Sequence, residues 1–283
     1  MSERGEISLT GLLVAMTIFM AVLGATLTTF EAFDSQAAGI TRRTDAQDAA
    51  RRGADRIARD LRNLAGPTQF LPEAVDLAGT SDLVFNVVDD VKPAGSLNKA
   101  NVKRVRYCLD APRRVIWQQE QRWTQADRPA MPAAAGCPAA AWGAATQVVD
   151  KVTNSARPIF TYDTAVRTSI SSVGVDLFVD DQPGAGPPET KISTGVFLRN
   201  QNRLPIARFT ATTTSQGVLL NGSASTDPEG QPLDFEWFNG TQKIGEGVTF
   251  LYAVPSGGSN AFSLRVSDSA GLAATSSSPQ VNP

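Results

Sequence analysis

Cys108 and Cys137 are the residues of this 283-residue chain whose chemistry is most readily interpreted. The chain has no histidine, so the commonest general base and the commonest zinc ligand are both missing. Two thiols without histidine make a poor transition-metal site. In an exported protein an even pair predicts a disulfide, and the alternative is two unpaired, buried thiols. We predict a Cys108–Cys137 bridge, no metal and no cofactor.

Carboxylates are the other groups that could do chemistry. Asp89-Asp90 and Asp180-Asp181 could act as acid and base, but they lie beside turn residues, which is typical of solvated loop ends. Asp227, Glu229 and Asp268 offer oxygen atoms to calcium, but their spacing is also ordinary turn chemistry. The sequence contains no nucleophile elbow, P-loop or dinucleotide fingerprint. We therefore expect a protein that is not an enzyme.

Composition narrows the class of protein further. Hydrophobic residues make up 42% and charged residues 19%, so the chain can bury a core. Its length suits one large or two modest domains. The formal net charge is -2, which supplies no basic field for phosphate polymers, so we expect no nucleic-acid partner.

The residues from Ile7 to Phe30 carry no charge and predict a transmembrane helix. As a helix, this segment spans about 36 Å, enough for a hydrocarbon core of about 30 Å. A cleaved secretory signal would have a shorter apolar run and a small-residue cleavage site, and a buried core helix would show a polar face. The apolar centre includes Leu12, Leu13, Val14, Ala15, Met16, Ile18 and Phe19.

The helical pattern continues beyond the membrane. The segment from Glu31 to Ala65 has no proline, and Gly66-Pro67 is a stop signal. We predict one helix within residues 7–66, apolar all round in its first half and amphipathic in its second. The predicted apolar stripe consists of Ala46, Ala49, Gly53, Ile57, Leu61 and Leu64.

The N-terminus resembles that of type IV prepilins and type II secretion pseudopilins, through the run Gly5-Glu6-Ile7-Ser8-Leu9-Thr10-Gly11-Leu12-Leu13-Val14-Ala15-Met16-Thr17. The resemblance implies a leader within residues 1–6, cut by a prepilin peptidase after Gly5 and before Glu6, and methylation of the new N-terminus. The family's membrane-buried glutamate falls on Gly11 in this chain. Since that acid is thought to meet a neighbour's amine, its absence favours a filament tip or an uncut anchor over a shaft.

Residues 67–202 predict a β-rich domain. Runs with alternating or β-branched residues span 82–89, 102–109, 113–120, 147–152, 159–162, 171–180 and 191–199. The second and third of these runs form a hairpin candidate around Asp110-Ala111-Pro112. Three short motifs resemble J-type minor pseudopilins and their PilW-like relatives: Asp60-Leu61-Arg62, Val105-Arg106-Tyr107 and Thr194-Gly195-Val196-Phe197-Leu198-Arg199-Asn200.

The loop Arg128 to Ala145 is rich in alanine, proline and glycine and contains Cys137. A bridge to Cys108 would tether this loop and stabilise the fold by about 3–4 kcal/mol. Trp117, Trp123 and Trp142 could form an exposed aromatic platform for a ligand, but packing aromatics are commoner in small β domains.

Residues 204–283 predict a β-sandwich, with strands at 207–211, 217–221, 233–238, 248–251 and 261–267. The run Leu220 to Trp237 and the run Phe262 to Gly271 resemble the PKD domain, an extracellular spacer and interaction module. The resemblance places Trp237 and Val266 in the core. It also places Asp227 and Gly230 in a tight turn, and Asp268 in the closing motif.

Together these features predict an α+β protein: a long N-terminal pilin helix packed on an antiparallel β domain, followed by a PKD-like β-sandwich. The expected function is that of a minor pilin-like subunit of a type IV pilus or type II secretion-like filament. Its expected partners are other pilin-like subunits, the cytoplasmic (inner) membrane, a prepilin peptidase, and a protein or glycan ligand of the sandwich. The N-terminus would be cytoplasmic and the bulk extracytoplasmic. The alternative is a membrane-anchored adhesion or binding protein outside any filament.

Overall fold

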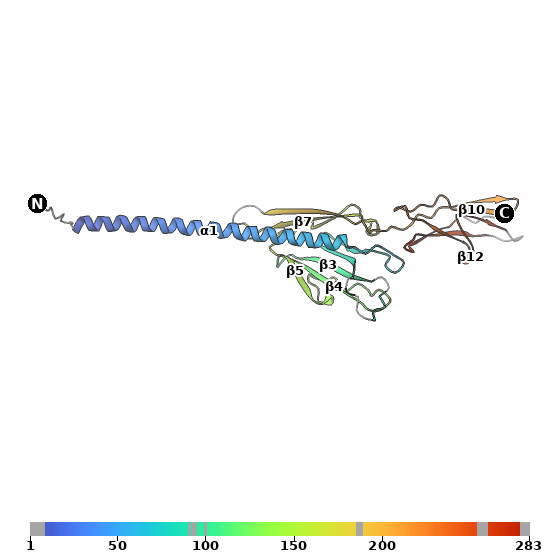
Figure 1. Ribbon diagram of the computed structural model, residues 1–283, viewed down its shortest axis with the longest axis horizontal. Coiled ribbons are helices and arrows are strands. Elements are labelled where there is room, and N and C mark those ends of the chain that lie inside the picture. The colour runs from blue at the N-terminus through green and yellow to red at the C-terminus, as the bar shows by residue number, and fades with distance from the viewer. Residues whose placement is uncertain are drawn as a thin grey trace.

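The computed structural model describes residues 9–89, 91, 95–98, 101–184, 189–253 and 260–277. One helix, α1 (Leu9–Arg62), extends alone over its first half and is flanked by β-sheets over its second half (Figure 1). A further β-rich unit lies at the end of the molecule opposite to the helix N-terminus (Figure 1). This arrangement confirms the predicted α+β class.

Burial along α1 begins at Ala46 and continues to the end of the helix. The predicted stripe is buried except for Ala49, which is half-buried, and the buried face is wider because it also includes Ala50, Ala54 and Ala58. Small residues allow close approach: a Cβ atom added at Gly53 would lie 2.1 Å from a methyl carbon of Val149. The helix is therefore a core element of the β domain as well as an extended rod.

The helix ends at Arg62, a few residues before the predicted stop at Gly66-Pro67. Arg59 and Arg62 occupy its last turn, where cationic side chains complement the helix dipole. Leu64 already forms an isolated β-bridge with Val87 of the adjoining sheet. Since Gly66 and Pro67 follow, the chain cannot resume the helix.

One face of α1 packs on an antiparallel sheet whose five strands follow in chain order. The predicted hairpin is confirmed, with Cys108 opposite Trp117 across its two strands. The first strand was not predicted. The strands are β1 (Val75–Ala78), β2 (Asp82–Val88), β3 (Val102–Asp110), β4 (Val115–Gln121) and β5 (Ala145–Val149).

A second antiparallel sheet also packs on α1, in the order β6 (Phe160–Tyr162), β7 (Ser172–Val179) and β8 (Thr190–Phe197). Buried and half-buried residues alternate along β7, as a strand with one buried face requires. Both sheets and the helix share one hydrophobic core, to which Ile57, Phe85 and Val175 belong. Short 3-10 turns lie at Ala140–Trp142 and Arg167–Ser169.

The C-terminal unit contains two antiparallel sheets around its own core, which includes Trp237, Leu220 and Leu264. The sequence did not predict β12 or β15, and β9 begins three residues later than expected. One sheet has the order β13-β10-β9 and the other β12-β11-β14-β15. The strands are β9 (Thr210–Thr214), β10 (Gly217–Asn221), β11 (Asp234–Asn239), β12 (Gln242–Glu246), β13 (Thr249–Tyr252), β14 (Phe262–Ser267) and β15 (Ala273–Ser277).

Candidate functional site

The first half of α1 is long and apolar enough to span a membrane. The predicted membrane-facing side chains Leu12, Leu13, Val14, Ala15, Met16, Ile18 and Phe19 are all exposed on the helix surface. A Cβ atom added at Gly11 would have no atom from outside its own stretch of helix backbone within 4 Å, so this face of the helix is open. Gly5 and Glu6, the predicted processing residues, lie outside the described residues.

Threonine hydroxyls in the apolar segment bond to the helix itself. The hydroxyl of Thr17 donates to the carbonyl of Val14 at 2.9 Å, and that of Thr26 donates to the carbonyl of Leu23 at 2.8 Å. Thr28 and Thr29 bond back to Ala25 in the same way. A hydroxyl inside a bilayer must find such a partner, because hydrocarbon supplies none.

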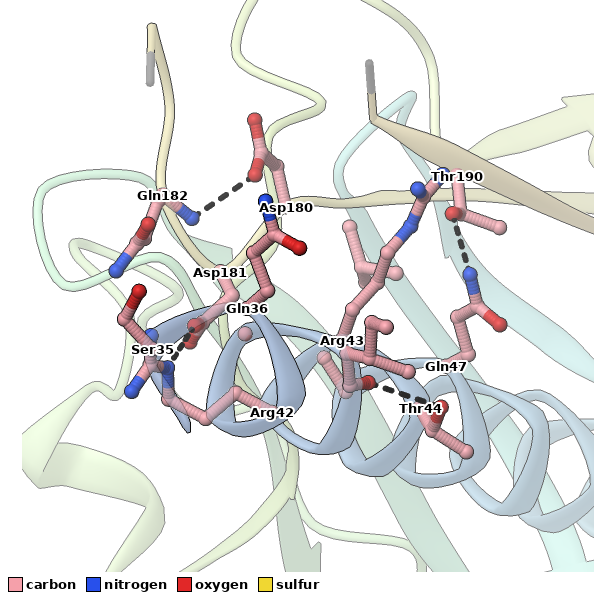
Figure 2. Close-up of a pocket in the computed structure, with 14 residues that line it drawn as sticks. Ser35, Gln36, Arg42, Arg43, Thr44, Gln47, Asp180, Asp181, Gln182 and Thr190 are labelled. Atoms are coloured by element: carbon pink, nitrogen blue, oxygen red, sulfur yellow. Dashed lines mark hydrogen bonds and ion pairs between the residues drawn. The ribbon is translucent and has the colours of Figure 1, made fainter. Parts of the chain in front are cut away.

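A cavity of about 630 Å³ lies where α1 enters the β domain, between the helix and the ends of β7 and β8. Two of the charged groups that line it, Arg42 and Asp181, form an ion pair, and Asp180 accepts the backbone amide of Gln182 (Figure 2). Arg42 Nε lies 3.2 Å from Asp181 Oδ2, and Lys151 Nζ lies 2.7 Å from the other oxygen of the same carboxylate. These two cations hold the pKa of Asp181 below its usual range, Lys151 having the larger effect. Asp181 is thus a permanently charged structural group and not a proton donor near neutral pH.

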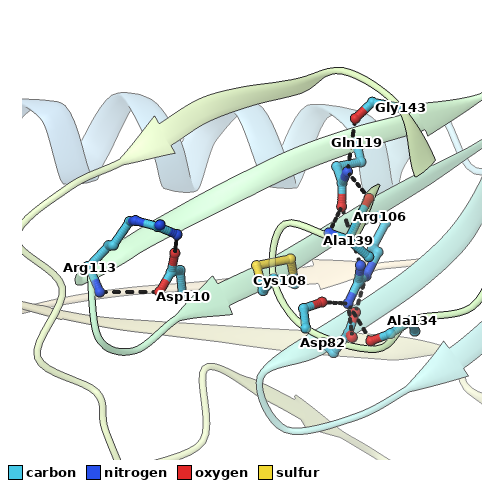
Figure 3. The surroundings of a disulfide bond; sticks show 11 residues. Asp82, Arg106, Cys108, Asp110, Arg113, Gln119, Ala134, Ala139 and Gly143 are labelled. Atoms are coloured by element: carbon cyan, nitrogen blue, oxygen red, sulfur yellow. Dashed lines mark hydrogen bonds and ion pairs between the residues drawn. A yellow bond between two sulfur atoms is a disulfide. The ribbon is translucent and has the colours of Figure 1, made fainter. Parts of the chain in front are cut away.

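The predicted disulfide between Cys108 and Cys137 is confirmed, with Cα atoms 5.8 Å apart. It joins β3 to the loop that covers the sheet face opposite α1 (Figure 3). At the nearby β3–β4 turn, Arg113 lies 2.8 Å from Asp110 and lowers the pKa of that carboxyl.

The side chain of Arg106, buried beside this disulfide, binds the backbone of the same loop. Its guanidinium donates to the carbonyl oxygens of Ala134 at 3.0 Å and Gly136 at 2.8 Å. Both oxygens of Asp82 accept from it, at 2.9 and 2.6 Å, so the buried charge is paired. Figure 3 shows these contacts around one side chain.

Arg104, two residues earlier on the same face of β3, repeats this arrangement. It is paired with the buried carboxylate of Asp76 at 2.6 Å and donates to the carbonyl oxygen of Pro129 at 3.0 Å. Its guanidinium lies over the ring of Trp123, 5.6 Å from the centroid, as Arg106 lies over Trp142 at 5.7 Å. Two arginine–tryptophan pairs and one disulfide therefore fix a loop that contains one short 3-10 turn, Ala140–Trp142.

Trp123 and Trp142 are both buried, Trp142 as part of the loop itself, and Trp117 is half-buried on β4. They do not form an exposed platform. The spacing of Arg104 and Arg106 is the sequence signal for these pairs: two residues apart in a strand, they share a face.

In the C-terminal unit, Trp237 is fully buried opposite Leu264, and Val266 lies in the same core. The indole nitrogen of Trp237 donates to the carbonyl oxygen of Gly247 at 2.8 Å. Asp227 Oδ1 accepts the backbone amides of residues 229 and 231 at 2.9 Å, and Gly230 has a φ of 73°. These contacts form a self-capped turn.

Asp268 is buried where the C-terminal unit meets the rest of the chain. One carboxylate oxygen accepts the amides of Ala270 and Leu272, and the other accepts the side-chain amide of Asn202 at 2.8 Å. Asn202 in turn accepts from Gln231 at 2.6 Å and lies 3.4 Å from the carbonyl oxygen of Pro67. We call this group the Asn202 junction; no sequence motif predicted it.

The carboxylates considered as calcium ligands do not converge. Glu229 pairs with Arg203 at 2.6 Å, whereas Asp268 bonds to Asn202. Within the described residues, no group of three or more acidic, cysteine or histidine side chains is placed to hold a metal ion.

No protein-family model matches the chain, and no curated protein matches it significantly. The coarse layout, a long N-terminal apolar helix followed by an antiparallel β domain, is compatible with that of pilin-like proteins.

Proposed function

We propose that this chain is a minor pilin-like subunit of the J-type pseudopilin kind, anchored by α1 in the cytoplasmic membrane and displaying its β domains outside. The observation that carries the proposal is the continuity of α1. One uninterrupted helix is both the apolar membrane segment and the central core element of the β domain. A simple membrane anchor would not need one continuous helix, because a flexible linker could join a separate membrane helix to the β domain.

The presence of glycine and not glutamate at position 11 supports a position at a filament tip. A carboxylate in the bilayer is costly unless it is paired, so a shaft subunit would use one to meet a neighbour's amine. This chain has no acid between Ile7 and Phe30. Its helix can therefore pack with other pilin-like subunits only through shape, which favours low copy number.

The C-terminal unit supports an interaction role, in which a PKD-like sandwich contacts a protein or glycan. Arg42 is paired with Asp181 at the cavity, and beneath the loop of residues 128–145 Arg104 is paired with Asp76 and Arg106 with Asp82. That engagement supports a role in assembly or binding and not in catalysis.

Processing at the N-terminus tests this proposal. Membrane-extracted protein should begin at Glu6, after removal of Met1–Gly5 by a prepilin peptidase. Quantitative proteomics of sheared filaments should find the chain at a small fraction of the major subunit. An intact Met1 together with absence from filaments would favour the second candidate, a solitary surface-anchored binding protein. Stoichiometry near that of the major subunit would contradict the tip position.

A further inference from the structure

The edge strand β9 of the C-terminal unit lacks the features by which sheets resist pairing with other strands. Within the described residues, β9 pairs only with β10, so the backbone groups on its other side have no strand partner. No charged residue occurs from Phe209 to Gly217, and the β9–β10 register is regular. Charges, bulges and short length are the usual protections of such edges.

Most other edge strands of the described chain have at least one of these protections or pack on α1. β1 contains Asp76 and a register shift, and β6 is three residues long. β8 carries Lys191 and packs on α1, and β12 carries Lys243 and a register shift. β5 packs on α1 and has a register shift against β4, and β13 is four residues long. β15 has no charged residue and pairs in a regular register with β14, so β9 and β15 are the described edge strands without these protections.

We propose that β9 pairs in antiparallel fashion with β9 of a second copy of this chain, with Thr212 opposite Thr212. This register places Thr210 opposite Thr214 and Ala211 opposite Thr213. Uncharged strands meet without like-charge repulsion, and cross-strand threonine pairs are favourable. The pairing also extends a row of exposed side chains that runs from Leu251 through Leu219 to Thr212.

The direction of β9 sets the arrangement of the two copies. The strands of the C-terminal unit run roughly along the long axis of the molecule, at the end opposite to the helix N-terminus (Figure 1). An antiparallel pair therefore joins two molecules that point in opposite directions. Their membrane helices then lie in two different, facing membranes.

Vesicle clustering tests this inference with the full-length protein. Phosphatidylcholine vesicles that carry the chain should cluster in dynamic light scattering as protein density rises, without recruiting labelled empty vesicles. Thr212→Lys should reduce clustering to the level of empty vesicles, because two lysines would face each other. Thr212→Val should retain clustering. Thr249→Lys is the matched control, since Thr249 is an exposed threonine on β13, at the other edge of the same sheet.

Mixing Thr212→Lys vesicles with Thr212→Asp vesicles should restore clustering, because the two charges then face each other. Melting curves from circular dichroism should match for Thr212→Lys and Thr249→Lys. A match would show that the loss of clustering in Thr212→Lys does not come from a folding defect. Absence of wild-type clustering, clustering that Thr212→Lys leaves intact, or failure of the mixture to cluster would each overturn the inference. Recruitment of empty vesicles would show lipid binding instead. None of these outcomes depends on leader cleavage or filament assembly.

Discussion

The phenol of Tyr107 on β3 donates a 2.6 Å hydrogen bond to the carboxylate of Asp60 on α1. Burial, together with the Asp60 charge, raises the pKa of Tyr107, so the phenol remains a donor at any ordinary pH. Gln118 on β4 donates to the same carboxylate oxygen at 2.9 Å. Helix and sheet are thus joined by a charge-assisted contact, beside which Arg56 of α1 donates to the side-chain oxygen of Gln118.

Replacing Tyr107 with phenylalanine should therefore lower the free energy of unfolding by about 1–3 kcal/mol, because a partly buried carboxylate loses a donor. Chemical denaturation of the full-length protein in detergent measures this loss. Tyr162→Phe is the control: its hydroxyl donates to the neutral carbonyl oxygen of Gly79 at 2.7 Å, so the expected loss is about 0.5–1.5 kcal/mol. A smaller loss at Tyr107 than at Tyr162 would contradict this account.

The disulfide closes a loop between positions 29 residues apart. Substituting both cysteines with alanine should cost about 3–4 kcal/mol of stability, through the added entropy of the unfolded chain. Hydrogen exchange in the loop should rise most near Cys137 and least near Pro129, since Arg104 still holds that carbonyl. Mass spectrometry of the natively exported protein should find no free thiol, and two alkylatable cysteines would count against the bridge.

Gly53 should not tolerate a side chain. Alanine normally favours a helix over glycine by about 1 kcal/mol, yet a Cβ here would collide with Val149. Gly53→Ala should therefore destabilise the protein by about 1–3 kcal/mol, the usual cost of overpacking. Gly39→Ala is the matched control, because no atom lies within 4 Å of a Cβ at that position. Equal melting temperatures for the two variants would refute the close approach of α1 and β5.

Glu189 and Arg157 should contribute to acid stability. The Arg157 guanidinium, bonded to this carboxylate, lowers the pKa of Glu189 to about 2. A lowered carboxyl pKa stabilises the fold above the unfolded value of about 4.3, and this contribution is lost as pH falls toward 2. Glu189→Gln should make the unfolding free energy less dependent on pH across this window. An unchanged pH profile would show that the pair does not contribute.

The regular elements were largely predictable, because hydrophobic periodicity reports them directly. α1 and the β3–β4 hairpin have clear patterns. β12 and β15 do not: β12 is mostly polar, and β15 consists of alanine, threonine and serine. Both take strand conformation through pairing with β11 and β14, which no local pattern reveals.

The candidate site was less predictable, since its contacts join residues far apart in the chain. Cys108 and Cys137 could be paired because they are the only two cysteines. Arg106 could not be matched with Asp82 and the carbonyls of the loop, because 24 residues separate the first pair and 28 separate Arg106 from Ala134. Asn202 lies 66 residues from Asp268, and an amide–carboxylate contact leaves no compositional signature.

The Asn202 junction has a mechanical consequence. Asn202 lies within reach of Pro67, just beyond the end of α1, and bonds to Asp268 and Gln231 of the C-terminal unit. The backbone amide of Gln69 adds a bond to the carbonyl of Ala270 at 3.3 Å. A pull on the outermost strands is therefore shared between the covalent linker and contacts beside the helix terminus. Tension on the C-terminal unit would pass into β8 through the covalent linker and into the end of α1 through these contacts, so that the helix shares the load with the sheet beside it.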